Sequence, residues 1–375
     1  MKILLIDPTL VYPGERAKLA AFAAIPWITL EALSGEQHRD EARLVRMPKM
    51  EQCHGIPFYQ GQIIGKFPNR TLLFGGLQGC LLRRPDVILA YSDWNHWLTL
   101  EIALAKNRYS PHSKLIIQAW ENQAPTWFRH PQPSVLFYAL DSIIERIIYR
   151  HSDGAVARNA EAQAVLERRG FRKPVHLIPW GVDMELFKPR RSSDARFTVG
   201  YVGRLVPEKG VADLLTALRG LNDIKALIIG SGPDEPNLRK LVARHNVLAE
   251  FVATVPQETL PEWYGQMDVL VLPSRTTRKW AEQFGRVLVE AMAMGIPAIG
   301  SDSGAIPWVI GDRELIYPEG NVQQLQDRIL MLKSSDHLRR IKANESRRRA
   351  RETFTWEKHA NSTVEFCREV YSCSR

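Results

Sequence analysis

Short apolar runs alternate along the chain with longer stretches whose apolar residues recur every three or four positions. The short runs have the length and the β-branched content that are typical of buried strands. Because helical spacing fills the stretches between them, the pattern predicts parallel sheets built from strand–helix–strand units. The runs expected to form strands are KILLID, DVILAY and KLIIQAW in the first half and FTVGYVG, KALIIG, DVLVLPS and IPAIGSD in the second.

A second series of strands and helices begins near the middle of the chain. Residues 178–196 carry two prolines, a glycine and a polar run before the next strand opens at Phe197. This composition is typical of a domain boundary, although a long surface loop inside one domain would look similar. We therefore predict an N-terminal α/β domain over residues 1–180 and a second one over residues 181–354. Helical spacing in residues 355–375 predicts a terminal helix, which we expect to pack on the N-terminal domain.

The overall composition is that of a positively charged globular protein. A formal net charge of +9 over 375 residues suits an anionic partner such as a nucleotide, a phosphorylated substrate or an acidic membrane surface. The four cysteines lack zinc-site spacing and are interpreted as reduced thiols. The opening MKILLIDPTL is too short for a signal peptide, and no apolar run is long enough to span a membrane. We therefore expect a cytoplasmic protein.

Two cations follow the first predicted strand of the second domain. The stretch YVGRLVPEKG places Gly203, Arg204 and Lys209 between the end of this strand and the start of a helix. Open α/β sheets bind ligands at the carboxyl ends of their strands, and a guanidinium together with an ammonium can hold a diphosphate. The alternative interpretation, two solvated loop cations, is the usual one for Lys and Arg and is the one that their spacing alone favours.

Two glutamates lie eight positions apart around the start of another predicted helix. Glu282 lies in the loop RTTRKWAEQFG, and Glu290 lies about one turn inside the helix RVLVEAMAMG. The helix start near Gly285 offers amide groups and a positive dipole end to an anion, and a carboxylate can accept two vicinal sugar hydroxyls. The alternative interpretation, a helix-start acid and a solvated helix face, is the one that these residues alone favour.

Several motifs of other enzyme classes are missing from the sequence. No GxGxxG follows the first strand, which argues against a hydride-transferring Rossmann enzyme, and no GxxxxGK[ST] loop of a P-loop ATPase is present. The sequence also has no DxD pair, no His and Cys cluster with zinc spacing and no GxSxG elbow. The class of enzyme therefore has to be inferred from the motifs that the sequence does contain.

Taken together, these motifs resemble those of the retaining nucleotide-sugar glycosyltransferases of family 4, the glycosyl transferases group 1. The resemblance is close over residues 197–315 and weak before about residue 175. It implies the GT-B fold, an α/β fold in which two Rossmann-like domains with parallel sheets face each other across a cleft. The matching stretches are GYVGRLVPEKG, IIGSGP, VLPS, EQFGRVLVEAMAMGIPAIGSDSGAIPWVIGD and FTWEKHA.

The resemblance also implies a role for each charged residue. Glu282 would contact the transferred sugar, and Glu290 the ribose of the donor. Arg204 and Lys209 would hold the diphosphate, so that Glu282, Arg204 and Lys209 form the catalytic set. The implied donor-binding residues are Gly14, Gly203, Arg204, Lys209, Phe284, Gly285, Arg286 and Glu290.

The activity implied by the resemblance is transfer of a hexose, with retention, from a nucleoside-diphosphate sugar to a hydroxyl of a glycan or lipid-linked acceptor. Such an enzyme of polysaccharide biosynthesis would need no metal ion or other cofactor and would favour UDP-sugars over GDP-sugars. Nucleic acid is not expected as a partner. Two alternatives stay open: a non-catalytic nucleotide-sugar-binding protein of the same fold and a sugar-nucleotide epimerase.

A few positions depart from the pattern of this family. Only Gly14 stands where the first loop often has paired glycines, and Trp180 replaces a common Asn in the hinge. Trp308 takes the place of a frequent acidic residue. A histidine of the N-terminal domain has no match near QAWENQ, where Glu121 or Asn122 could serve instead.

Residues 134–151 have two interpretations. Their apolar helical pattern, with Arg146 and Arg150 near its end, is typical of an interfacial helix that contacts an anionic membrane. A core helix of the N-terminal domain explains the pattern equally well. Peripheral contact with the cytoplasmic face of a membrane is therefore a hypothesis at this stage.

Overall fold

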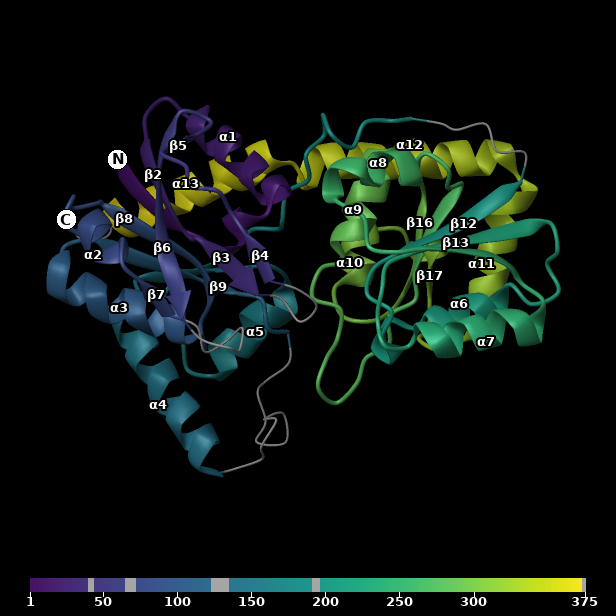
Figure 1. Ribbon diagram of the computed structural model, residues 1–375, viewed down its shortest axis with the longest axis horizontal. Coiled ribbons are helices and arrows are strands. Elements are labelled where there is room, and N and C mark those ends of the chain that lie inside the picture. The colour runs from purple at the N-terminus through teal and green to yellow at the C-terminus, as the bar shows by residue number, and fades with distance from the viewer. Residues whose placement is uncertain (40–43, 65–71, 123–134, 191–195, 373–375) are drawn as a thin grey trace. The chain divides into compact units, whose positions relative to one another are not determined.

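The chain folds into two compact units, each built on its own sheet (Figure 1). The computed structural model describes residues 1–39, 44–64, 72–122, 135–190 and 196–372. Unit 1 comprises Met1–Pro179 together with Trp356–Arg375, and unit 2 comprises Trp180–Thr355. The chain therefore leaves unit 1 once and returns to it for its last helix.

Unit 1 contains a nine-stranded sheet in the order β11-β10-β9-β8-β1-β2-β6-β5, with β7 also paired to β6. The strands from β11 to β6 run parallel, whereas β5 and β7 run antiparallel to β6. β3 and β4 form a separate two-stranded antiparallel sheet. The strands are β1 (Lys2–Ile6), β2 (Thr29–Gly35), β3 (Gln37–Arg39), β4 (Leu44–Arg46), β5 (Gln52–Cys53), β6 (Ile56–Ile64), β7 (Leu72–Phe74), β8 (Val87–Asp93), β9 (Lys114–Ala119), β10 (Gly154–Ala157) and β11 (Val175–Leu177).

Helices cover both faces of the unit 1 sheet. α1 packs on α13 on one face, and α2 to α5 contribute to an apolar core on the other (Figure 1). Because the central strands are covered on both sides, they are largely buried and mostly apolar, as in other parallel sheets. The helices are α1 (Ala17–Ala23), α2 (Leu77–Leu81), α3 (Trp97–Tyr109), α4 (Val135–His151), α5 (Ala160–Arg168) and α13 (Trp356–Ser372).

A buried ion cluster lies where β1 ends. The Lys18 ammonium, on a fully buried side chain, donates to a carboxylate oxygen of Asp7 and, at 3.2 Å, to Oε2 of Glu15. The same ammonium lies 4.9 Å from the centre of the Tyr91 ring. An isolated buried charge would be strongly destabilising, so the two carboxylates and the ring offset the burial of this cation.

A second buried network fixes the point at which the chain leaves unit 1. Nε2 of His359 accepts a hydrogen bond from the Tyr91 hydroxyl at 2.6 Å, and Nδ1 donates to the Pro179 carbonyl at 2.8 Å. Arg158 donates to the Ile178 carbonyl at 3.1 Å. Burial, assisted by the Arg158 charge, lowers the pKa of His359 well below its usual value. The imidazole is therefore neutral, which lets one ring nitrogen donate while the other accepts.

The hypothesis of an interfacial helix falls partly on described residues of α4. Ile144 is buried in the core of unit 1, so one face of α4 belongs to a core helix. The other face exposes 39% of Leu140 and 54% of Ile143, with Arg146 and Arg150 also exposed. None of the helices in the described part of the chain combines the length and the hydropathy needed to cross a membrane.

The cysteines of the described ranges are buried free thiols, as expected for reduced cysteines. They are Cys53, Cys80 and Cys367, while Cys373 lies outside the described residues. Burial raises the pKa of Cys80 to about 12, so its thiol stays protonated at neutral pH.

Unit 2 contains a six-stranded parallel sheet in the order β14-β13-β12-β15-β16-β17. This is the order of a doubly wound Rossmann sheet, in which the chain reverses direction across the sheet between its first and fourth strands. Here these strands are β12 and β15. The strands are β12 (Phe197–Val202), β13 (Ile224–Ile229), β14 (Leu248–Val252), β15 (Val269–Leu272), β16 (Ala298–Ser301) and β17 (Ile316–Tyr317).

The helices of unit 2 also form two layers. α6 packs against α7 and α11 on one side of the sheet, and α9 packs against α12 on the other (Figure 1). Asn321 and Ser335 cap α11 and α12 by accepting backbone amides in the first turn. The helices are α6 (Val211–Ala217), α7 (Glu235–His245), α8 (Leu260–Tyr264), α9 (Arg286–Ala293), α10 (Ile306–Ile310), α11 (Val322–Ser334) and α12 (Asp336–Thr353).

The two ends of unit 2 lie side by side within the unit. Val182, near its start, donates its backbone N–H to the carbonyl of Phe354 at 2.7 Å, and it forms a parallel bridge with Thr355. The entering and leaving segments of unit 2 are therefore joined by backbone hydrogen bonding.

Candidate functional site

The charged residues singled out in the sequence gather at the carboxyl edge of the unit 2 sheet. The loops that follow β12 and β15 leave this edge from neighbouring strands, because these strands pair directly. Here the chain turns to opposite sides of the sheet, and doubly wound folds bind ligands in the crevice at such a point. The geometry thus places these residues at the edge of the sheet where doubly wound folds bind ligands.

The loop after β12 is held in place by backbone contacts and one buried hydroxyl. Tyr201, the fully buried penultimate residue of β12, donates its hydroxyl to the carbonyl of Arg204 at 2.7 Å. Burial, with the nearby Glu282 carboxylate, raises the pKa of Tyr201 well above its usual value, so the hydroxyl remains a donor. The Arg204 side chain is exposed. The Tyr201 hydroxyl therefore helps to fix the backbone of the loop that carries this exposed arginine.

The end of this loop is packed against the loop after β15. Gly210 has a φ of +66° and begins α6. A Cβ atom at this position would lie 1.9 Å from the carbonyl oxygen of Pro273. Only glycine combines this left-handed conformation with so close a backbone approach. The contact brings Lys209, the neighbouring residue, next to the β15 loop.

Lys209 and Glu282 form a direct ion pair across the two loops. Nζ of Lys209 lies 2.7 Å from Oε2 of Glu282, and the same carboxylate oxygen accepts the Ser274 hydroxyl at 2.8 Å. Glu282 is only 6% exposed and Ser274 is fully buried. The Lys209 ammonium also lies 4.5 Å from the centre of the Trp280 ring. A cation and a carboxylate are thus held together at the switch point of the sheet.

The N-terminus of α9 lies directly after Glu282 in the chain. Gly285 caps the helix with a φ of +77°, and Arg286 is its exposed first residue. Phe284 is buried beside Trp308 and Phe354, with ring centres 6.2 and 5.7 Å away. Helix starts of this kind present amide groups to anions. Trp308, which replaces a frequent acid of the family, serves here as an aromatic packing partner.

Glu290 lies one turn into α9 and is held by two side chains. Tyr264 donates its hydroxyl to Oε2 of Glu290 at 2.8 Å, and Gln257 donates from Nε2 to Oε1 at 3.2 Å. Glu290 is 5% exposed and Tyr264 is fully buried. Burial and the Glu290 carboxylate raise the pKa of Tyr264 well above its usual value. The solvated helix face that the sequence alone favoured for Glu290 is therefore wrong.

The structure brings most of the predicted site residues into unit 2 and leaves one in unit 1. Lys209 and Glu282 touch, whereas Gly14 lies in a short 3-10 helix, Pro13–Arg16, of unit 1. Three side chains that hold the two carboxylates were not singled out in the sequence: Ser274, Tyr264 and Gln257. Ser274 belongs to the VLPS stretch, which was a signal for it, but Tyr264 and Gln257 carry no local signal.

Two acids of unit 1 lie at the carboxyl ends of β8 and β9. Asp93 is buried and accepts the backbone N–H of Trp94 at 2.9 Å. Burial, with the Glu121 carboxylate, raises the pKa of Asp93 to about 8, so this carboxyl group is largely protonated at pH 7. Asn122 donates to Oε2 of Glu161 at 3.2 Å. The suggestion that Glu121 or Asn122 serves in place of a histidine stays a prediction.

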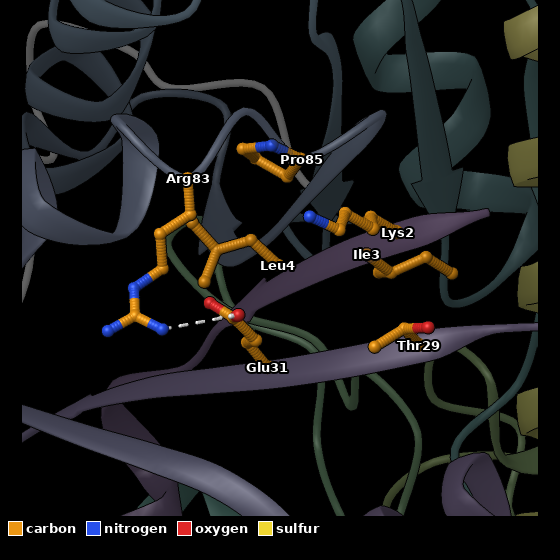
Figure 2. A pocket seen from close by; sticks show the side chains of 7 residues that line it. All are labelled: Lys2, Ile3, Leu4, Thr29, Glu31, Arg83 and Pro85. Atoms are coloured by element: carbon orange, nitrogen blue, oxygen red, sulfur yellow. Dashed lines mark ion pairs between the residues drawn. The ribbon is translucent and has the colours of Figure 1, made fainter.

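Unit 1 also has a small pocket, which lies away from the acids at the carboxyl ends of β8 and β9. Figure 2 shows it beside the first residues of β1 and β2, where Arg83 and Glu31 form an ion pair of 3.7 Å. The Arg83 side chain is 54% exposed, so the pair contributes little to stability. Since the pocket lies at the amino ends of the strands, opposite to the ligand-binding edge of α/β sheets, we assign it no role in the site.

Comparison with known proteins identifies the class of the fold first. A sucrose-phosphate synthase from Thermosynechococcus elongatus superimposes with a TM-score of 0.72 at 19% identity and covers 100% of both chains. Anabaena HepE, solved in complex with UDP, gives 0.71 at 18% identity and covers 98% of this chain and 100% of its own. These similarities show the fold, which is the two-domain α/β fold of the GT-B glycosyltransferases.

Sequence comparison gives a more specific match for unit 2. Residues 183–352 match the family model described as Glycosyl transferases group 1. The sulfoquinovosyl transferase of Arabidopsis thaliana is 27% identical in an alignment 351 residues long, which covers 85% of this chain and 66% of that protein. The chain spans 66%, 56% and 44% of three curated relatives, so it corresponds to only part of each.

Proposed function

We propose that this protein is a retaining glycosyltransferase that moves a hexose from a nucleoside-diphosphate sugar to a hydroxyl of a glycan or lipid-linked acceptor. The observation that carries the proposal is the 2.7 Å contact between Lys209 and Glu282 at the switch point of a glycosyl transferases group 1 domain. It sets a cation suited to a diphosphate beside a carboxylate suited to sugar hydroxyls. One ligand that carries both groups, a sugar nucleotide, fits this pair.

The charges of the site fit a transfer that needs no metal ion. Arg204, Lys209 and the amide groups at the start of α9 supply positive potential for the departing diphosphate. The bond between the anomeric carbon and the phosphate oxygen breaks while the acceptor oxygen bonds to that carbon on the same face. The acceptor proton passes to the departing phosphate oxygen. Glu282 positions the sugar and stabilises the positive charge that develops on it.

The remaining residues of the donor set bind the nucleotide. Glu290 accepts hydroxyls of the donor ribose, and the backbone at Gly203, Phe284 and Gly285 approaches the phosphates. Gly14 of unit 1 belongs to the set on the strength of the family resemblance alone. UDP is favoured over GDP, and the complex of Anabaena HepE with UDP supports this choice.

A thermal-shift screen of nucleotide sugars would identify the donor. A ligand at a hundred times its dissociation constant adds about 2.7 kcal/mol to the free energy of unfolding, which a melting experiment detects readily. No stabilisation by any UDP- or GDP-sugar would contradict the proposed function. Binding without turnover would favour the non-catalytic alternative, and interconversion of donor sugars without acceptor would favour an epimerase.

Replacing the two glutamates one at a time should separate recognition of the nucleoside diphosphate from recognition of the transferred sugar. We expect Glu290→Ala to weaken binding of the bare nucleoside diphosphate about tenfold, because it removes acceptors of the ribose hydroxyls. Glu282→Ala should mainly impair binding of the complete sugar nucleotide. Calorimetry with both ligands on both variants checks this, with Glu345→Ala on the exposed face of α12 as the control. Equal effects of both substitutions on both ligands would refute the division.

The stereochemistry and the metal requirement can be tested together. NMR of the first-formed product, made in buffer with EDTA, should show the anomeric configuration of the donor and an undiminished rate. The expected rate follows from the charges of Arg204 and Lys209, which take the role that a metal ion has in other transferases. An inverted product, or activity that disappears with the chelator and returns with a divalent cation, would mean that the site is misassigned.

Peripheral contact with an anionic membrane is part of the proposal. Leu140 and Ile143 on the exposed face of α4, near Arg146 and Arg150, have the chemistry of an interfacial helix. The protein should therefore co-sediment with phosphatidylserine vesicles at low salt, and Ile143→Asp should weaken this severalfold. Leu248→Asp, at a similarly exposed leucine of unit 2, is the control. Absence of binding at low salt would contradict the proposed membrane contact, but it would not contradict the proposed transfer reaction.

A further inference from the structure

Each of the two site carboxylates is held by a fully buried hydroxyl. Ser274 donates to Glu282, and Tyr264 donates to Glu290, both at 2.8 Å. The Tyr264 bond joins the end of α8 to the middle of α9, which are 26 residues apart in the chain. The hydrogen bond between Tyr264 and Glu290 therefore forms only when unit 2 is folded.

The position of the Tyr264 ring leaves little freedom for its hydroxyl. Phe187 packs edge-on against the ring, with the centres 5.9 Å apart and an angle of 77° between the planes. On the far side, the hydroxyl lies 2.8 Å from Oε2 of Glu290 and 3.4 Å from the carbonyl oxygen of Val287. A donor clamped in this way fixes the direction of its acceptor, because hydrogen bonds weaken steeply when they are misaligned.

The second oxygen of Glu290 is held from another direction. Gln257, just before α8, donates to Oε1 at 3.2 Å while Tyr264 donates to Oε2. One donor on each oxygen sets the plane of the carboxylate, which a single donor would leave free to turn. A carboxylate must present this plane edge-on to accept two vicinal hydroxyls in its lone-pair directions.

We propose that Tyr264 is a positioning residue that orients the Glu290 carboxylate for the ribose hydroxyls of the donor, with Gln257 holding the other oxygen. The inference rests on the proposed function of the site. Tyr264 itself does not touch the nucleotide in this arrangement. Its hydroxyl acts through Glu290, so its loss affects the ribose contact and leaves contacts to base and phosphates unchanged.

The test compares two ligands that differ only in the ribose hydroxyls. Calorimetry measures the affinity of the protein for UDP and for 2′,3′-dideoxyuridine diphosphate, and the corresponding GDP pair if UDP does not bind. We expect the wild type to prefer the ribonucleotide about tenfold. Tyr264→Phe should bring the ratio of the two affinities close to one by weakening the ribonucleotide alone.

A buried tyrosine elsewhere in unit 2 provides a matched control. Tyr317 of β17 is 1% exposed, and its hydroxyl has no hydrogen-bond partner among the described residues. Tyr317→Phe removes a hydroxyl at similar burial and should leave the affinity ratio unchanged. If Tyr264→Phe fails to fold, Gln257→Leu, at a half-buried position, serves in its place and should lower the ratio severalfold.

The outcomes separate this inference from the proposed function. A Tyr264→Phe protein that folds and keeps the full ribose preference would overturn the inference while the glycosyltransferase proposal stands. An equal fall in the ratio for Tyr317→Phe would also overturn it, because the effect would then be structural. If the wild type binds neither UDP nor GDP, the proposed function fails, and the inference fails with it.

Discussion

Lys209→Ala should lower kcat/KM for sugar transfer by a factor of about 100 to 1,000, the size of effect expected when one group that stabilises a developing anion is removed. The ammonium is the cation next to Glu282 and would also face the departing diphosphate. Arg204→Ala should lower kcat/KM at least a hundredfold, because its guanidinium belongs to the same loop. Steady-state kinetics with the identified donor checks both expectations.

The control for these variants is a lysine of unit 2 that lies outside the site. Lys225 is the second residue of β13 and pairs with Glu250 at 2.8 Å, near the amino end of the strand. Lys225→Ala removes one charge of the same kind and should leave turnover within about twofold of the wild type, as surface ion pairs contribute little. Near-normal turnover of both Lys209→Ala and Arg204→Ala would show that neither cation stabilises the leaving group.

Gly210→Ala should destabilise unit 2 more than any conservative change in the loop after β12. The residue has a φ of +66°, which costs a side-chain-bearing residue about 1–2 kcal/mol. The added Cβ would also lie 1.9 Å from the Pro273 carbonyl oxygen, so the loops after β12 and β15 must separate. We expect the melting temperature to fall by about 10 °C and binding of the nucleoside diphosphate to be lost.

Gly220→Ala separates the two causes of this effect. Gly220 also has a positive φ, +79°, but an added Cβ would meet no atom within 4 Å. The variant therefore carries the backbone strain without the collision, and its melting temperature should fall by only a few degrees with ligand binding unchanged. Equal losses in both variants would show that the contact between Gly210 and Pro273 does not hold the site together.

The central strands of both sheets were predictable because their signal is local. KILLID, DVILAY and KLIIQAW became β1, β8 and β9, and the four runs of the second half became β12, β13, β15 and β16. β2 was not predicted, although the structure places it next to β1. Its sequence, TLEALSG, carries a glutamate and a serine, and Ser34 is 1% exposed in the folded unit, where β2 pairs with β1 and β6.

The charged residues of the candidate site could be singled out from the sequence, but the side chains that hold them in place could not. Arg204, Lys209, Glu282 and Glu290 stand out because their spacing around strand ends and glycines is itself informative. Tyr264 has no such spacing, and its hydrogen bond to Glu290 depends on how α8 packs on α9. For the same reason, the sequence alone gave Glu290 a solvated surface, whereas tertiary packing leaves it 5% exposed.

The pairing of Val182 with Phe354 and Thr355 has a consequence for how such chains can diversify. Because unit 2 begins and ends at adjacent backbone positions, it has the form of an insertion that occupies one point in the chain of unit 1. Segments whose ends are close together can be exchanged between proteins with little disturbance of the host. Recombination at these two positions would replace the whole of unit 2 in one event, while the hydrogen bond between His359 and the Pro179 carbonyl would stay within unit 1. The two units can then evolve as separately inherited parts of one chain.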